Sequence, residues 1–227
     1  MMPILTVVTL DGPAGAGKST VAREVARRLA YRFLDTGAMY RTVTWTAHRE
    51  GIAADDADGL RGLCERLAIG FDDQGRVFAG DEDVSEAIRT RAAKTRVLAL
   101  AAQPVVRRAM ARAQRLLGEE GRLVCEGRDM GTDVFPDAML RIYLDASPEV
   151  RARRRCLELE AKGEVVDEKA LLEEIKRRDE ADSNRSEAPL RRVAGQILID
   201  SSHLDREDVI KHITSLAQEA MLVHDRE

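Results

Sequence analysis

The fold is decided by the stretch Gly12-Pro13-Ala14-Gly15-Ala16-Gly17-Lys18-Ser19-Thr20. It fits the pattern of a glycine, four free positions and then Gly-Lys-Ser, which is typical of loops that hold a polyphosphate. Glycines permit backbone angles at which successive N–H groups turn toward phosphate oxygens. Lys18 offers a mobile positive charge to the β- and γ-phosphates, and the Ser19 hydroxyl suits a Mg²⁺ ion. All nine residues are therefore predicted to line a nucleotide site.

The segments on both sides of this loop support that prediction. Residues 3–10 form an apolar run that indicates a buried strand. After the loop, apolar residues recur at helical spacing at positions 21, 22, 25, 26 and 29. A glycine-rich loop between a strand and a helix is the arrangement that a phosphate-binding loop requires.

The rest of the chain alternates between strand and helix patterns. Further strands are predicted at 31–34, 123–125, 139–144 and 196–200. Helices are predicted at 36–51, 60–67, 85–102, 104–117, 147–162, 167–182 and 205–220, with Thr36 as the N-cap of the first of these. Residues 68–84 indicate a hairpin, which we interpret as a small β insertion. The alternation predicts an α/β fold in which a five-stranded parallel sheet has helices on both faces.

Composition limits the classes of function. A chain of 227 residues with 44% hydrophobic and 33% charged residues suits one globular core. The net charge of −4 argues against binding nucleic acid through bulk positive charge. Three widely spaced cysteines indicate neither a disulfide framework nor a metal site. Since we find no leader sequence and no membrane-spanning run, we expect a soluble cytoplasmic protein that acts without a membrane or nucleic-acid partner.

Ligands of parallel α/β sheets bind beyond the carboxyl ends of the strands, and arginines follow several of these ends. Arg41, Arg107 and Arg128 are predicted to hold a second anion opposite the glycine loop, since guanidinium groups match phosphate oxygens. Two arginine-rich helices suggest a lid over the phosphates, with contacts from Arg154, Arg155, Arg178 and Arg185. For five other arginines we favour a solvated charged face, namely Arg151, Arg153, Arg177, Arg191 and Arg192.

Many cations and no evident general base favour phosphoryl transfer to an acceptor that is itself a phosphate. Such an acceptor is mostly dianionic at neutral pH, so it needs no base to remove a proton. Transfer to a metabolite hydroxyl fits less well, because that chemistry usually uses a positioned base. A lid would exclude water and so protect the transferred group from hydrolysis.

Several longer segments resemble the bacterial cytidylate kinase family of P-loop nucleoside monophosphate kinases. The resemblance rests on GPAGAGKST, LDTGAMYR (34–41), EGRDMGTDVFPDA (126–138), YLDASPEVRARRR (143–155) and RRDEADSNRSEAPL (177–190). It covers nearly the whole chain and includes the β insertion. It implies one kinase domain over 1–227, with an NMP-binding region at 36–107, the insertion near 68–84 and a lid region at 151–187.

The resemblance also implies the reaction and its residues. Its members transfer the γ-phosphate of ATP to CMP or dCMP with Mg²⁺ at Ser19, and we expect a monomer with only these nucleotides as partners. Lys18, Arg128, Arg178 and Arg185 correspond to catalytic positions, and Arg154 and Arg155 to ATP-binding positions of the lid. The implied acceptor contacts are Thr36, Tyr40, Arg41, Arg107, Arg128, Asp129, Arg178, Asp182 and Arg185, with Arg107 and Asp129 at the cytosine.

One position departs from the family pattern. Members commonly carry a serine six residues before the proline at 104, where it helps to read cytosine, and this chain has Leu98. Leucine cannot make that hydrogen bond, so UMP or dTMP remains an alternative acceptor. A nucleotide-binding switch without a small-molecule acceptor is a second alternative, although the chain has no Asn-Lys-x-Asp motif for guanine.

Overall fold

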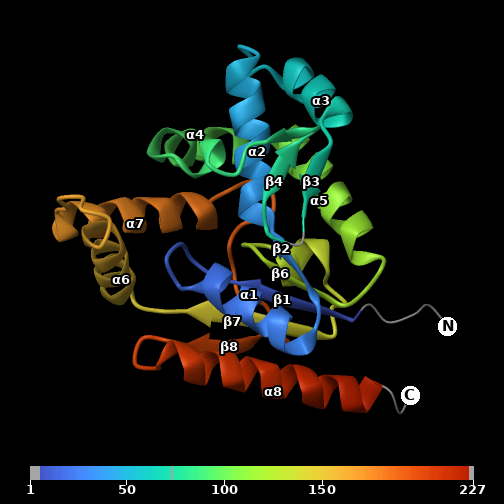
Figure 1. Cartoon of the computed structure of the whole chain (residues 1–227), viewed down its shortest axis with the longest axis vertical. Helices are drawn as coiled ribbons and strands as arrows, with labels where there is room; N and C mark the ends of the chain where they lie inside the picture. Colours follow the sequence, from blue (N-terminus) through green and yellow to red (C-terminus); the bar gives the residue numbers. More distant parts are fainter. Residues whose placement is uncertain (1–5, 73, 225–227) are drawn as a thin grey trace. The chain divides into compact units, whose positions relative to one another are not determined.

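The computed structural model describes residues 6–72 and 74–224, with the side chains of 91, 92, 94, 95 and 224 left out of the description. The chain divides into two compact units (Figure 1). The first comprises Met1–Leu34 and Gly118–Glu227, and the second is Asp35–Leu117. The NMP-binding region expected at 36–107 falls within the bounds of the second unit.

The first unit is built on a five-stranded sheet with the strand order β2-β6-β1-β7-β8. These strands are β1 (Val7–Asp11), β2 (Arg32–Asp35), β6 (Leu123–Glu126), β7 (Leu140–Asp145) and β8 (Ile197–Asp200). β1 pairs in parallel with both β6 and β7, and β7 pairs in parallel with β8. Every residue of β1 is buried, as expected for the central strand of a sheet with both faces covered.

Helices α1 (Lys18–Leu29) and α8 (Arg206–His224) pack against this sheet and against each other. Their apolar faces, including Val21 and Val25 of α1 and Ile213 of α8, share one core cluster with β1 and β7. Helices α6 (Pro148–Glu160) and α7 (Glu168–Ser183) form a packed pair in the same unit. The predicted α/β fold, a five-stranded parallel sheet flanked by helices, is confirmed.

The second unit holds α2 (Thr36–Arg49), α3 (Ala57–Arg66), η1 (Ala87–Arg89), α4 (Arg91–Ala101) and α5 (Pro104–Gly118), whose last residue crosses the boundary. Its small antiparallel sheet has the order β3-β4-β5, from β3 (Ile69–Phe71), β4 (Val77–Ala79) and β5 (Glu82–Asp83). Val77, Val84 and Ile88 form a core cluster with Ala38 of α2. The predicted hairpin thus exists, and a short third strand, β5, follows it.

The register of the parallel strands brings their carboxyl ends to one edge of the large sheet. Leu10 lies opposite Glu126, Asp11 opposite Tyr143, and Asp145 opposite Asp200. Because parallel strands end together, acidic residues that follow apolar runs in the sequence meet at this edge. The loop of residues 12–17 leaves from the same edge and leads into α1.

Two local predictions were wrong. Asp35, and not Thr36, caps α2, because the Asp35 carboxylate accepts a hydrogen bond from the N–H of Ala38 at 2.8 Å. The helix predicted at 85–102 is divided into η1 and α4, since Thr90 is extended and caps α4. Residues Met130–Val134, for which no element was predicted, form a π-helical turn, η2.

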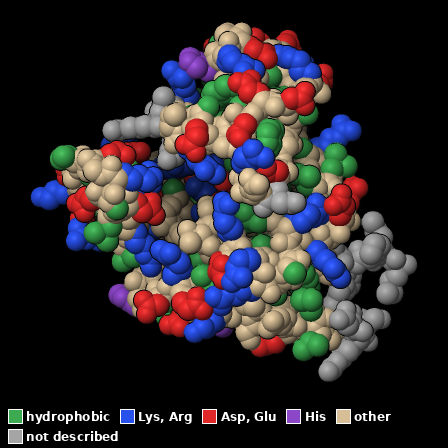
Figure 2. All heavy atoms as spheres, in the orientation of Figure 1, with side chains coloured by type: hydrophobic (Ala, Val, Ile, Leu, Met, Phe, Trp, Pro, Cys, Tyr) green, Lys and Arg blue, Asp and Glu red, His purple; other side chains and the backbone are tan. Residues whose placement is uncertain are grey.

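Acidic and basic side chains are interspersed on the face of the molecule that Figure 2 shows. This mixture accords with the small net charge of −4. Among the described residues, no helix combines the length and the apolar character needed to cross a bilayer.

Candidate active site

The glycine loop is held against the sheet by its first residue. Gly12 has a φ of +143°, and a Cβ atom there would lie 2.0 Å from the carbonyl oxygen of Leu144 in β7. Only glycine allows this close approach. The loop therefore starts from a fixed point at the carboxyl end of β1.

Lys18 begins α1 and is buried, with its Nζ donating a hydrogen bond of 2.7 Å to the carbonyl oxygen of Pro13. Burial first, and then the positive charges of Arg128 and Arg178, lower the pKa of Lys18 to about 7, against the opposing effect of Glu126 and Asp182. The charged form of Lys18 is thus disfavoured in the free protein, and a bound anion would favour it.

Ser19 Oγ donates a hydrogen bond of 2.5 Å to Glu126 Oε1 at the carboxyl end of β6. Both residues thus place oxygen atoms beside the start of α1, at the amino end of the helix dipole. Hydroxyl and carboxylate oxygens are the ligands that Mg²⁺ prefers. The pair fits a magnesium ion held next to the phosphates of a nucleotide.

Asp11, the last residue of β1, fixes the backbone that follows Asp129. Its two carboxylate oxygens accept hydrogen bonds of 2.7 Å from the N–H groups of Met130 and Gly131, and Oδ2 accepts a third of 3.0 Å from Gln196. Burial raises the pKa of Asp11 to about 6, although the two backbone donors oppose this. Asp11 therefore determines where η2 starts and where the buried Asp129 side chain originates.

Arg128 and α7 are joined by a partly buried ion pair. Arg128 Nε donates to Asp182 Oδ2 at 2.8 Å, and Arg185 lies 3.6 Å from Asp182 Oδ1. Burial acts to raise the pKa of Asp182, but Arg128 and then Arg185 outweigh it, so the pKa lies below its ordinary value. Asp182 is thus a carboxylate shared by two arginines.

The remaining arginines of the arginine-rich helices differ in their surroundings. Arg154 donates to the carbonyl oxygen and Oγ of Ser201 at 2.6 and 3.1 Å, whereas Arg155 pairs with Glu158 at 2.8 Å. Arg178 is close enough to influence Lys18. The exposed face predicted for five arginines is confirmed for Arg153, Arg177, Arg191 and Arg192. It is wrong for Arg151, which is 3% exposed because it points toward the glycine loop.

The second unit brings together another group of predicted residues. Arg107 is buried, donates to the carbonyl oxygen of Ala101 at 3.2 Å and lies with Cζ 5.6 Å from the centre of the Tyr40 ring. Arg41 donates to Asp35 Oδ2 at 3.1 Å. Thr36, at the start of α2, is buried. Arg41, on α2, is thus held by the N-cap of that helix, and Arg107 of α5 lies near the aromatic ring of Tyr40 on α2.

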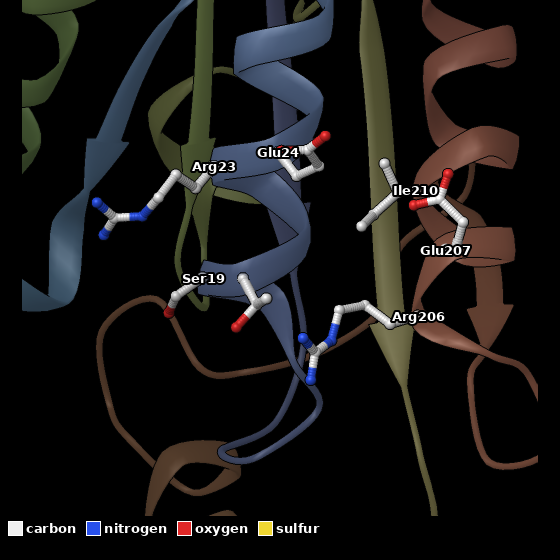
Figure 3. Close-up of a pocket in the computed structure, with 7 residues that line it drawn as sticks. Ser19, Arg23, Glu24, Arg206, Glu207 and Ile210 are labelled. Carbon is white, nitrogen blue, oxygen red and sulfur yellow. The ribbon is translucent and has the colours of Figure 1, made fainter.

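An open pocket of about 460 Å³ adjoins Ser19 and Thr20 on the side of α8 (Figure 3). Its walls come from the first turns of α1 and α8, including Arg23 and Arg206. Figure 3 shows the Arg206 side chain extending from α8 toward the amino end of α1. The pocket therefore places two arginines, together with Glu24 and Glu207, beside the end of the glycine loop.

Three functional candidates were missed from the sequence. Glu126 and Asp11 each end a strand next to the site, and that position was the signal that could have revealed them. For Arg151 the neighbouring arginines hid the signal, because periodicity does not distinguish one charged position of a short polar helix from the next. Its buried position only becomes evident from the fold.

Comparisons with known proteins agree with this site. The family model described as "Cytidylate kinase" matches residues 8–219. A cytidylate kinase of Geobacter sulfurreducens is 47% identical over 216 residues, which cover 94% of this chain and 93% of the relative. One of Syntrophotalea carbinolica is 44% identical, with 96% and 94% covered. A bifunctional pantoate ligase/cytidylate kinase of Synechococcus is 43% identical over 95% of this chain and 41% of its own length.

Solved structures with lower sequence identity also support the fold. A crystal structure of a gluconokinase from Sinorhizobium meliloti 1021 matches 100% of this chain and 99% of its own, with a TM-score of 0.51 and 14% identity. At that identity the likeness concerns the fold alone. The family match and the close relatives extend from before the glycine loop to α8, and the chain therefore belongs to the cytidylate kinase family.

Proposed function

We propose that this chain transfers the γ-phosphoryl group of ATP to CMP or dCMP, giving CDP or dCDP. Family membership over residues 8–219 supports the reaction class. The glycine loop supports a triphosphate donor, since its backbone and Lys18 lie at the start of a helix, where anions are stabilised. The name "cytidylate kinase" of the relatives supports the choice of acceptor.

The observation that carries the proposal is the cluster of cationic side chains around Lys18. Arg128 and Arg178 act on the buried Lys18, Arg185 lies 3.6 Å from Asp182, and the carboxylates of Glu126, Asp179 and Asp182 act on members of this cluster. Cations that lie close together away from bulk water are costly unless anions neutralise them. Phosphoryl transfer between two nucleotides brings that negative charge, and its transition state spreads the charge over several oxygens.

The roles of the donor-side residues follow from their geometry. Ser19 and Glu126 would hold Mg²⁺, which when bound would supply positive charge to neutralise the phosphates. Lys18 would exchange its contact with Pro13 for the β- and γ-phosphates. Arg154 and Arg155, on α6, are proposed to bind the donor phosphates. No side chain needs to remove a proton, because the acceptor is a phosphate.

The acceptor roles rest on the family resemblance. Arg41 and Arg128 are proposed to bind the acceptor phosphate, with Thr36 and Tyr40 beside Arg41. Arg107 and Asp129 are proposed to contact cytosine. Arg178, Asp182 and Arg185 are proposed to contact the sugar and the transferring phosphate. Leu98 on α4, which is 39% exposed, cannot supply the hydrogen bond that serine provides elsewhere in the family.

A panel of acceptors tests the assignment. With Mg²⁺ and ATP, initial rates are compared for CMP, dCMP, UMP, dTMP and AMP under matched conditions. We expect CMP and dCMP to give the largest kcat/KM. If UMP or dTMP were the better acceptor, the cytidine assignment would be wrong while the kinase reaction would stand. ATP hydrolysis that no acceptor stimulates would favour the switch alternative.

Three further features belong to the proposal. Omitting Mg²⁺ or adding EDTA should abolish transfer, since Ser19 and Glu126 form only part of a metal site. We also propose a monomer, so light scattering should give a mass near 25.2 kDa. We propose a cytoplasmic enzyme, in accord with cysteines that are free in the structure.

A further inference from the structure

Arg151 has three partners in three different segments, although it lies on a helix rich in arginines. Its Nε donates to the carbonyl oxygen of Ala146 at 2.7 Å, in the turn between β7 and α6. One terminal nitrogen donates to the carbonyl oxygen of Ala14, in the glycine loop, at 3.0 Å. The other forms an ion pair of 2.7 Å with Asp179 on α7. The planar guanidinium thus binds the loop with one nitrogen and α7 with another.

The hydrocarbon part of Arg151 also supports the loop. Gly15 has a φ of +82°, and a Cβ added there would lie 3.3 Å from the Cβ of Arg151. The Arg151 side chain is 3% exposed, whereas the Asp179 side chain is 22% exposed. A guanidinium this deeply buried is tolerated only where its N–H groups are all engaged and its charge is paired. Any shift of the loop at Ala14 must therefore move Arg151 or break one of its contacts.

Asp179 connects Arg151 to the charged residues of α7 that are proposed to bind the acceptor. It precedes Asp182 by three residues on α7, so the two carboxylates lie on neighbouring positions of one helix face. Asp182 binds Arg128 at 2.8 Å, and Arg128 follows β6. A continuous chain of contacts therefore runs from the glycine loop through Arg151 and α7 to Arg128.

We propose that Arg151 and Asp179 form a strut that couples occupancy of the glycine loop to the position of α7. Arg151 is a positioning residue in this account, since it acts through Ala14 and Asp179 and holds no reacting atom. Binding of a nucleotide to the loop would fix Ala14, and the strut would hold α7 in the place where Arg178, Asp182 and Arg185 act. The identity of the second ligand rests on the proposed function, but the coupling does not.

Hydrogen exchange tests the coupling without any acceptor. Amide exchange of α7 is measured by mass spectrometry with and without Mg²⁺ and a non-hydrolysable ATP analogue. In the natural sequence, we expect the analogue to slow exchange in the last two turns of α7 about fivefold or more, the lower end of typical coupling between sites. Asp179→Asn and Arg151→Gln should each remove most of that protection while the loop itself remains protected.

The control is Arg153→Gln, on the same helix, whose side chain is 59% exposed and pairs with Glu168 at the surface. It should behave as the natural sequence does. Unfolding of each variant is followed by circular dichroism. If Arg151→Gln folds poorly, Asp179→Asn still tests the strut, because it keeps Arg151 in place. A double variant should lose no more protection than Arg151→Gln alone, because both changes break the same contact.

Two results would overturn the proposal. One is protection of α7 in Asp179→Asn equal to that in the natural sequence, and the other is additive losses in the double variant. Neither depends on CMP, so a failure of the acceptor panel is distinguishable from a failure of the strut. If CMP is the acceptor, its affinity should increase when the analogue is present, and the two variants should reduce that increase while Arg153→Gln preserves it.

Discussion

Nucleotide binding should draw a proton onto Lys18. Its pKa of about 7 reflects burial first and then the positive charge of Arg128, whereas an exposed lysine titrates near 10.5. Phosphate oxygens at the loop would favour the charged ammonium and return the pKa toward its ordinary value. The difference of about 3.5 units corresponds to about 5 kcal/mol at most between the two protonation states.

The direction of the pH dependence follows from the linkage between proton binding at Lys18 and nucleotide binding. A lysine with a depressed pKa is mostly neutral above pH 7 in the free protein, so binding at pH 8 takes up about 0.9 proton, and binding at pH 6 about 0.1. The neutral form of the free protein competes with binding, and the affinity should therefore be about tenfold weaker at pH 8 than at pH 6. Affinity is lost as the pH rises through the pKa of free Lys18.

The assay is isothermal calorimetry with Mg²⁺ and a non-hydrolysable ATP analogue. Titrations in two buffers of different ionisation enthalpy give the number of protons taken up. Lys18→Arg is the control, because a guanidinium stays charged over this range and should show no uptake at that position. An uptake near zero at pH 8, together with equal affinities at pH 6 and 8, would refute the reasoning, since Lys18 would then be charged before the nucleotide arrives.

Other changes should separate the roles of the buried carboxylates. Glu126→Gln should raise the Mg²⁺ concentration for half-maximal rate about tenfold, because the amide beside Ser19 attracts a cation less; an unchanged Mg²⁺ requirement in steady-state kinetics would contradict this. Asp182→Asn should reduce the unfolding free energy by about 3 kcal/mol and raise the KM for CMP, since Arg128 loses its charged partner; urea titration and kinetics measure both, with the exposed Glu180→Gln as control. The raised pKa of Asp11, about 6 against 3.8, means that the folded state favours the protonated acid, so its stabilising effect falls by about 1.4 kcal/mol between pH 5 and 8. Asp11→Asn should lack this component of the pH dependence of the unfolding free energy, which urea titrations measure. If the unfolding free energy changed with pH equally in Asp11→Asn and in the natural sequence, this prediction would be wrong.

The sequence predicted the fold well because its signals are local. The order of strand, glycine loop and helix is visible in residues 3–29, and alternation of the two periodicities predicts the parallel sheet. The rule that ligands bind beyond the carboxyl ends of parallel strands pointed to the correct edge of the sheet, where the register of β1 and β6 places Leu10 opposite Glu126. The sequence could not predict which polar groups at that edge bind each other.

The misses have one physical origin. Ser19 and Glu126 are 107 residues apart, and Arg151 and Ala14 are 137 residues apart, so neither contact leaves a local pattern. Arg151 resembles its exposed neighbours in every local property and differs only in what the fold places against it. The roles of the acceptor residues, such as Arg107 and Asp129, stay predictions until kinetics test them.

The close approach of Gly12 to β7 has a consequence for mutagenesis. A methyl group at this position would overlap the Leu144 carbonyl, so Gly12→Ala would distort the neighbouring strand even in the absence of a nucleotide. Loss of activity in that variant would therefore result from a distorted sheet and not from weaker binding of phosphate. Gly17 is a better place to probe the loop, because the space around its Cβ position is open among the described residues and a substitution there meets only backbone strain at its φ of +91°. An alanine scan of this loop consequently measures two different quantities at its two ends.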